Sequence, residues 1–557
     1  MPARQAMWER IGGEVDLLVV GGGITGAGIA RDAARRGLSV ALVEMHDLAS
    51  GTSSRSSKLV HGGLRYLEHY ELGLVFEAVS ERRILMDLAP HLVNPLGFLF
   101  PVYAGARRNM WMIQAGMWLY DGLSLFRSPK RHRKLKPKEV AELEPALKRE
   151  GLKGAPLFYD CSTDDARLTL ETALDAAKAG ATVATWCRVE SFLKEDTGRL
   201  RGAVVKDELT GELRELEART VVNATGPWTD RTIAMSQPLA TGALLRPTKG
   251  IHIVVDSEKL PLEHAVVCFH PHDRRVLFAI PWGDRTYIGT TDTDYDGDPA
   301  LVAATGEDVD YLIDASNHYF PERTIARADV ISTWAGLRPL IAPPSTAGDL
   351  AESAVSREHQ ILVGQDGLIT IAGGKLTTYR RMAAEVVDTV ARMLQLSPGF
   401  ARRIRPSDTD QHPLPGGVGW PEDDDHEAVA SRIVEAGAPH VPRDVARHLG
   451  DSYGMCGLEI ARLCVADPPL GERLAPERPE ILAQIDWAVN QELATRLADV
   501  LIRRTQIFYR AHDQGLGVAP KVADRMADLL DWSATRRHEE LEMYAAEVAL
   551  SRQWREE

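Results

Sequence analysis

Short apolar runs separated by glycine dominate the first part of the chain. Leu17–Val20 is continuously apolar, Gly21 interrupts it, Ala27–Arg36 has helical composition, and a second apolar run, Leu38–Val43, ends at Glu44. A short apolar run bounded by glycine is typical of a buried parallel strand. The order strand, helix, strand predicts a βαβ unit of about 30 residues.

The pattern changes to closely spaced strand-like runs between Leu244 and Thr291. Such spacing predicts an antiparallel sheet inserted into the α/β domain. These runs are Ile251–Val255, Ala265–Phe269, Val276–Ile280 and Tyr287–Gly289.

After residue 419 the chain becomes helical and charged, as in Glu480–Val489 and Leu493–Arg504. The expected fold is therefore an α/β Rossmann-like domain with an inserted antiparallel β-sheet substrate domain and an all-α C-terminal domain. The expected boundaries are 13–105, 151–240 and 336–397 for the Rossmann-like domain, 106–150 for an apolar and basic insert, 241–335 for the sheet, 398–419 for a linker and 420–557 for the helices.

Three glycines in the first turn indicate a dinucleotide site. Gly21 permits the tight turn, Gly23 lets backbone amides approach a pyrophosphate, and Gly26 lets the helix pack closely on the strand. The helix start adds unpaired N–H groups and a partial positive charge. Glu44 is placed to accept hydrogen bonds from an adenosine ribose.

A second glycine turn repeats this pattern over Gly373–Arg380, where Lys375, Thr377 and Thr378 occupy the first turn of a helix. A cationic, donor-rich helix start suits the pyrimidine edge of an isoalloxazine, where negative charge develops on reduction. NAD needs no second distant glycine turn, whereas an extended FAD must be held at both ends. The two turns together therefore predict FAD.

Composition limits the other possibilities. With 557 residues, two or three domains are expected. The net charge of −14 argues against nucleic-acid binding. Five cysteines without C-x-x-C spacing indicate reduced, mostly buried thiols in a cytosolic chain, with no metal site. We expect no signal peptide and no membrane span.

The segment Met110–Phe126 has two interpretations. It is rich in Trp and Met, and a dense basic stretch follows it at 127–138. It is either a core helix followed by a solvated loop, or an interfacial segment beside a polybasic patch that meets an anionic membrane surface.

Several motifs together resemble the FAD-dependent glycerol-3-phosphate dehydrogenase family, within the D-amino-acid-oxidase-like flavoproteins. The resemblance covers essentially the whole chain. The motifs are Gly21–Gly28, Thr52–Tyr70, Asp164–Leu168, Val222–Trp228, Ile288–Asp292, Gly336–Leu340 and Gly373–Arg380. Two features depart from the family pattern: the basic stretch at 127–138, and a longer N-terminal segment before the first strand.

The resemblance implies oxidation of sn-glycerol 3-phosphate to dihydroxyacetone phosphate, with electrons passing from FAD to a membrane quinone. It implies a peripheral location on the cytoplasmic membrane's inner face and a homodimer. The expected FAD contacts are Gly21, Gly23, Thr25, Gly26, Glu44, Ser53, Ser54, Ser57, Lys58, His61, Gly62, Val189, Ala224, Thr225, Gly226, Gly374, Lys375, Leu376 and Thr377.

A dianionic phosphate requires clustered cations, and arginine can bind phosphate oxygens with two parallel hydrogen bonds. The expected substrate residues are Arg65, Tyr66, Arg338, Arg357 and Lys375, and Arg338 is also expected to take part in catalysis.

Loss of the hydroxyl proton during oxidation calls for a base. His252 is the candidate, because strand alternation places it on the face shared with Val254; the alternative is a core histidine. His61 is expected to contact the flavin rather than the substrate. Asp292 and Thr290 are expected to support the site.

Three rival functions remain open. An oxidase could use O₂ on the same substrate. An amine or amino-acid oxidase of the same superfamily would need fewer cations. A non-catalytic FAD-binding or nucleic-acid-modifying module is opposed by the acidic charge.

Overall fold

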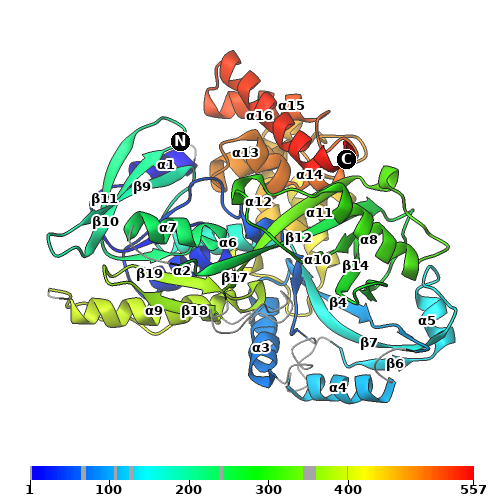
Figure 1. The fold of residues 1–557 in the computed structure, drawn as a ribbon. Coiled ribbons are helices and arrows are strands. Elements are labelled where there is room, and N and C mark those ends of the chain that lie inside the picture. Colours follow the sequence, from blue (N-terminus) through cyan, green and yellow to red (C-terminus); the bar gives the residue numbers. More distant parts are fainter. Residues whose placement is uncertain are drawn as a thin grey trace.

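Two sheets and a region of packed helices make up the fold (Figure 1). The computed structural model describes residues 3–63, 71–105, 110–123, 130–237, 242–342, 359–397 and 399–557. The α/β class with an antiparallel sheet and a helical C-terminal region is confirmed.

The first sheet is mainly parallel. In spatial order its strands are β18 (His359–Val363), β19 (Ile369–Gly373), β11 (Leu213–Asn223), β1 (Glu14–Val20), β2 (Val40–Val43) and β8 (Thr182–Ala184). Only β18 runs antiparallel to its neighbour in this described order. The antiparallel strands β9 (Cys187–Lys194) and β10 (Leu200–Asp207) continue from β11.

Both faces of β1 are covered, which explains its continuous apolar run. Leu17 and Val19 pack in a core with α2 (Ile24–Arg35), α6 (Asp165–Lys178) and α9 (Tyr379–Leu396). Leu18 and Val20 face a second core that includes Trp8 of α1 (Ala3–Glu9). The predicted βαβ unit is therefore confirmed.

The second sheet is mainly antiparallel. Its strands are β16 (Thr293–Asp294), β12 (Leu245–Asp256), β15 (Arg285–Gly289), β14 (Val276–Trp282), β13 (Ala265–Phe269), β4 (Val93–Leu99), β7 (Leu152–Thr163) and β3 (Leu59–Val60), with β17 (Ser332–Ile341) on β12 and with β5 (Val102–Tyr103) and β6 (Arg133–Leu135) on β7. The strands predicted from Ile251 to Gly289 are confirmed as β12 to β15.

The second sheet also takes in strands from residues 59–163, which precede the segment assigned to it from the sequence. The parallel pairing of β4 with β13 joins the two parts. This pairing covers backbone groups that would otherwise form an open edge.

Strand alternation in β12 follows the sequence prediction. Ile251, Ile253 and Val255 face a core that includes Leu312 of α8 (Gly306–Tyr319). Val254 faces the other side, where residues of the helical region pack on the sheet.

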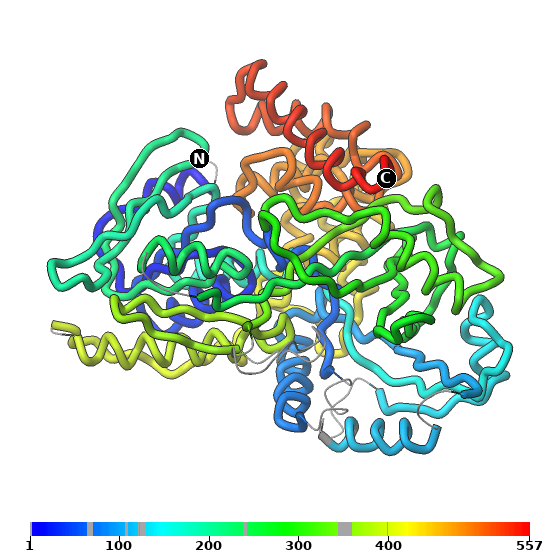
Figure 2. Tube along the Cα trace, viewed as in Figure 1, coloured from blue at the N-terminus to red at the C-terminus, as the bar shows by residue number. Residues whose placement is uncertain are grey.

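The C-terminal region packs on both sheets, and α13 contacts the N-terminal helix α1 (Figure 2). Its helices are α10 (His426–Gly437), α11 (Arg443–Tyr453), α12 (Gly457–Ala466), α13 (Ala483–Gln491), α14 (Ile507–Arg510), α15 (Ala519–Leu530) and α16 (Ala534–Arg552). The remaining helices are α3 (Leu72–Leu88), α4 (Met110–Leu123), α5 (Pro137–Leu143) and α7 (Thr229–Ser236).

Two segments differ in character from the sequence expectation. The end of the expected linker 398–419 packs against the rest of the protein: Leu414 is buried, and the Gly416 amide donates a hydrogen bond to the Glu171 carboxylate (3.0 Å). Within Leu493–Arg504, the end from Asp499 forms a π-helix. The five cysteines are free and four of them are buried, as predicted.

Candidate functional site

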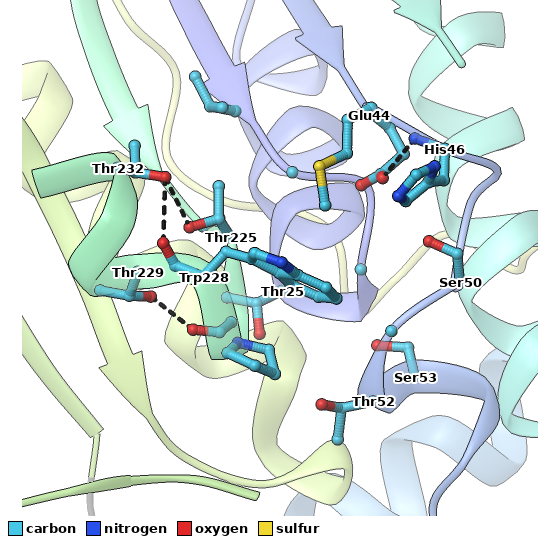
Figure 3. A pocket seen from close by; sticks show the side chains of 18 of the residues that line it. Thr25, Glu44, His46, Ser50, Thr52, Ser53, Thr225, Trp228, Thr229 and Thr232 are labelled. Atoms are coloured by element: carbon cyan, nitrogen blue, oxygen red, sulfur yellow. Dashed lines mark hydrogen bonds between the residues drawn. The ribbon is translucent and has the colours of Figure 1, made fainter. Parts of the chain in front are cut away.

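A cavity of about 610 Å³ lies where the turns after β1, β2, β8, β11 and β19 converge (Figure 3). This volume lies in the range of small-molecule and cofactor sites. Twelve expected cofactor residues line it: Gly21, Gly23, Thr25, Glu44, Ser53, Val189, Ala224, Thr225, Gly226, Gly374, Lys375 and Leu376.

The first glycine turn leaves the start of α2 open toward the cavity. Gly21 has φ +110°, and a Cβ atom there would lie 2.6 Å from the Ala224 carbonyl oxygen. A Cβ atom at Gly26 would collide with the Gly21 carbonyl oxygen. Gly23 is the N-cap and brings no side chain over the first amides. A helix start of this kind can bind a pyrophosphate.

Glu44 occupies the end of β2 (Figure 3). Its carboxylate accepts hydrogen bonds from the amides of Gly22 (2.6 Å) and His46 (2.9 Å). Burial raises its pKa, although both amides act in the opposite direction. A carboxylate has about four lone-pair sites, so Glu44 can also accept ribose hydroxyl groups.

The serine-rich segment divides between the cavity and the protein interior. The Ser53 hydroxyl faces the cavity and accepts from the Ile24 amide at the start of α2 (2.9 Å). Ser54 and Lys58 are buried and lie outside the cavity lining. The Lys58 ammonium is 2.6 Å from the Asp165 carboxylate. It is therefore directed to a buried partner rather than to the cavity.

The second glycine turn forms the opposite end. Gly373 and Gly374 have φ of +72° and +91°, and Lys375 follows them on the cavity wall. The Thr377 hydroxyl accepts from the His61 amide (3.1 Å) and lies 3.3 Å from the His61 carbonyl oxygen. His61 and Thr377 thus connect the serine-rich segment to the second turn without lining the cavity.

Gly62 also lies outside the lining, because its amide donates to Tyr120 (3.0 Å) and Asp160 (3.1 Å). Sequence reasoning missed Trp228 and Thr232, which line the cavity beside Thr225 (Figure 3). Trp228 closes the Val222–Trp228 motif, which was the available signal.

His252 is buried where the second sheet packs on the helical region, and it lies outside the cavity lining. Its Nε2 atom is 3.0 Å from the Ser57 hydroxyl, and its ring stacks on Trp334 with centroids 4.6 Å apart. Burial, and then the charges of Arg338 and Lys58, lower its pKa well below the ordinary value. The imidazole is therefore neutral at physiological pH and can accept a proton.

Arg338 lies on β17 beside β12. Its guanidinium donates to the Asp292 carboxylate (3.0 Å) and the Thr290 hydroxyl (3.0 Å). These two residues fix its orientation, which is the supporting role expected of them. Of the other predicted substrate residues, Lys375 lines the cavity, and Arg65, Tyr66 and Arg357 lie outside the described residues.

Comparisons with known proteins give consistent results. A family model for FAD-dependent oxidoreductases matches residues 16–380, and a model for the C-terminal domain of alpha-glycerophosphate oxidase matches residues 407–537. The aerobic glycerol-3-phosphate dehydrogenase of Staphylococcus epidermidis is 38% identical over 97% of this chain and 94% of its own length. That of Staphylococcus aureus is 39% identical over 96% and 94%.

Solved structures extend the comparison. An X-ray structure of glycerol-3-phosphate dehydrogenase from Bacillus halodurans complexed with FAD has 34% identity and a TM-score of 0.79, covering 98% of this chain and 97% of that one. L-alpha-glycerophosphate oxidase from Mycoplasma pneumoniae has 17% identity and a TM-score of 0.53, covering 72% of this chain and 99% of that one. The second likeness concerns the fold alone.

Proposed function

Because the chain belongs to the family of FAD-dependent glycerol-3-phosphate dehydrogenases, we propose that it oxidises sn-glycerol 3-phosphate to dihydroxyacetone phosphate. FAD is its cofactor and, when bound, accepts the hydride from the substrate carbon. The observation that carries the proposal is the cavity between two remote glycine turns, with Lys375 on its wall.

Cations at the substrate site neutralise the phosphate. Arg338, held by Asp292, Thr290 and the Thr291 carbonyl oxygen, keeps its guanidinium in one orientation, in which its positive charge can attract a phosphate oxygen. Lys375 adds a point charge. Arg65, Tyr66 and Arg357 complete the proposed set.

His252 is the proposed base. Its Nε2 atom takes the hydroxyl proton through the Ser57 hydroxyl group, which lies 3.0 Å away. The lowered pKa leaves the imidazole neutral before this step, although the same burial makes it a weaker base than an ordinary histidine. The stacked Trp334 ring keeps the imidazole in place.

A membrane quinone is the proposed electron acceptor, and O₂, the acceptor of an oxidase, is the alternative. A peripheral position on the inner face of the cytoplasmic membrane would give access to quinone. It is supported by the exposed Trp111 (69%) and Trp118 (58%) on α4 and by the exposed Phe76 on neighbouring α3. Interfacial tryptophans beside basic residues favour an anionic membrane surface.

The basic residues that follow α4 in the described chain are Lys130, Arg131, Arg133, Lys134, Lys136 and Lys138. Among the described residues, every helix is too short or too polar to span a bilayer. A homodimer is part of the same proposal and can be tested by sedimentation.

Anaerobic flavin reduction tests the reaction. Glycerol 3-phosphate should bleach the flavin absorption of the holoprotein, whereas glycerol, amino acids and other phosphorylated polyols should leave it unchanged or bleach it slowly. Reoxidation by a quinone analogue should outpace reoxidation by dissolved O₂. Bleaching by an amino acid instead would reject the proposed substrate, and faster reoxidation by O₂ would identify an oxidase.

A further inference from the structure

One residue of the helical C-terminal region lies on the cavity wall. Arg496 lines the cavity together with His46 and Trp186. Its guanidinium carbon is 4.3 Å from the centre of the Trp186 ring, and Trp186 in turn packs edge-on against His46 with centroids 5.5 Å apart. These residues surround the end of the cavity that contains Glu44.

This end is the one expected to hold adenosine. In a dinucleotide-binding βαβ unit, the first glycine turn holds the pyrophosphate, and the acid after the second strand holds the ribose. Glu44 is that acid, and the backbone of Cys187 donates to its carbonyl oxygen over 2.7 Å. The turn after β8, which carries Trp186 and leads into β9 at Cys187, is therefore fixed beside the adenosine position.

A single buried carboxylate joins this turn to the helical region. Asp499 accepts a hydrogen bond from the Trp186 indole (3.2 Å) and from the backbone amides of Thr495 (3.0 Å) and Arg496 (2.9 Å). Because the same group holds Trp186 and the Arg496 backbone, the two residues keep a fixed relative position.

A second buried group, Asp47 in the turn that follows β2, binds the helical segment through ion pairs. Asp47 is fully buried, and its carboxylate pairs with both terminal nitrogens of Arg504 (2.6 and 2.9 Å) and with Arg503. Burial alone would raise the pKa of Asp47, but the two guanidinium groups outweigh it and hold the pKa below its ordinary value. The pairing is therefore ionic.

Arg496 has unused donor capacity. Within the described part of the chain, its Nε atom is buried without a hydrogen-bond acceptor. Its Nη1 atom makes a long contact of 3.4 Å with Glu540 and lies 3.1 Å from the Met543 sulfur, a weak acceptor. The Nε atom is closed off from the cavity, so a ligand there would meet the terminal guanidinium nitrogens, which together carry four N–H donors.

We propose that Arg496 is an FAD-binding residue, contributed by the helical region, that donates a hydrogen bond to the adenosine part of the cofactor. Adenine ring nitrogens and ribose oxygens both provide acceptors for this donor. The FAD site is thus completed only when the C-terminal region is docked through Asp47 and Asp499.

Ligand binding to the full-length protein without its flavin tests this assignment. We would titrate FAD and ADP into wild type, Arg496→Met, Arg496→Lys and Arg536→Met. Arg536 matches Arg496 as a control because it also pairs with Glu540 but does not line the cavity.

Arg496→Met should raise the Kd of both ligands by about tenfold or more, the effect of losing a charged hydrogen bond. Arg496→Lys should recover part of this loss, and Arg536→Met should bind both ligands as wild type does. The assignment is overturned if Arg496→Met binds ADP like wild type. It is also overturned if Arg536→Met weakens ADP binding as much, because the effect would then come from disturbed helix packing.

Discussion

Replacing Lys58 with methionine is expected to destabilise the protein by about 3–5 kcal/mol, the cost of breaking a buried ion pair. The ammonium group lies 2.6 Å from the Asp165 carboxylate, and both side chains are almost fully buried. Methionine retains the length of the stem but leaves the carboxylate without its cation. Aromatic rings of Trp334 and Tyr509, 5.3 and 5.6 Å from the ammonium, also lose a cation–π contact.

A double-mutant cycle isolates the pair. Lys58→Met and Asp165→Asn should each lower the Tm of the holoprotein by about 3–4 °C, the shift that about 3–5 kcal/mol gives in a chain of this length. The double variant should be less destabilised than the sum of the two, with a coupling energy of about 1–3 kcal/mol. Arg83→Met, which breaks a half-exposed pair with Asp87, is the control and should change the Tm little.

The pH dependence provides a second check. Burial opposes the charge on Lys58 most strongly, but Asp165, Asp164 and Tyr509 together outweigh it, and the pKa of Lys58 is raised above its ordinary value. The stabilisation is therefore complete below about pH 10 and is lost only at higher pH. In the wild type the pair should therefore contribute the same stability at about pH 6 and about pH 8. Additive single variants would refute the ion-pair explanation.

Three further predictions concern the site and its surroundings. The folded pKa of His252 is lowered, so the unfolded state binds more protons than the folded state below about pH 6.5. The wild type should therefore lose about 1 kcal/mol of stability between pH 6.5 and pH 5.5, whereas His252→Gln should not show this loss. Urea titrations at the two pH values measure the difference. Arg338→Ala should raise the KM for glycerol 3-phosphate by about 100-fold, since each charged hydrogen bond contributes about 1.5–3 kcal/mol; an unchanged KM in steady-state assays would exclude phosphate binding. Neutralising the six basic residues between 130 and 138, or replacing Trp118 with serine, should weaken sedimentation with anionic vesicles, and equal binding would dismiss a membrane role for α4.

Local patterns were sufficient for much of the fold. The βαβ unit was predictable because the apolar runs at Leu17–Val20 and Leu38–Val43 are buried on both faces. Between them, Gly21 and Gly26 leave no room for a Cβ atom, so no other residue type fits there. Alternation in β12 placed His252 and Val254 together for the same reason. These features depend on neighbours within a few residues.

Long-range contacts account for what the sequence did not reveal. Lys58 was expected to donate to the cofactor because it follows a run of serines, yet Asp165, far along the chain, draws it into the interior. Arg496 had no local signal, since it reaches the cavity only through the docking of the helical region. Within Leu493–Arg504, the helical pattern was recognisable, but the π-helix from Asp499 was not.

Buried charges, as well as apolar surface, determine how the helical region docks. Arg167 of α6 pairs with Glu492 (2.8 Å) over the Tyr453 ring, and Arg504 pairs with Asp47 at the end of β2. An apolar contact tolerates sliding, whereas a buried charge displaced from its partner costs several kcal/mol. The two pairs also meet, because the Arg504 guanidinium donates to the Glu492 carbonyl oxygen (2.7 Å), so one buried charge network specifies the docked orientation of the segment that carries Arg496. A cavity wall built across these two regions can then keep a fixed shape, which a binding site for an extended cofactor requires.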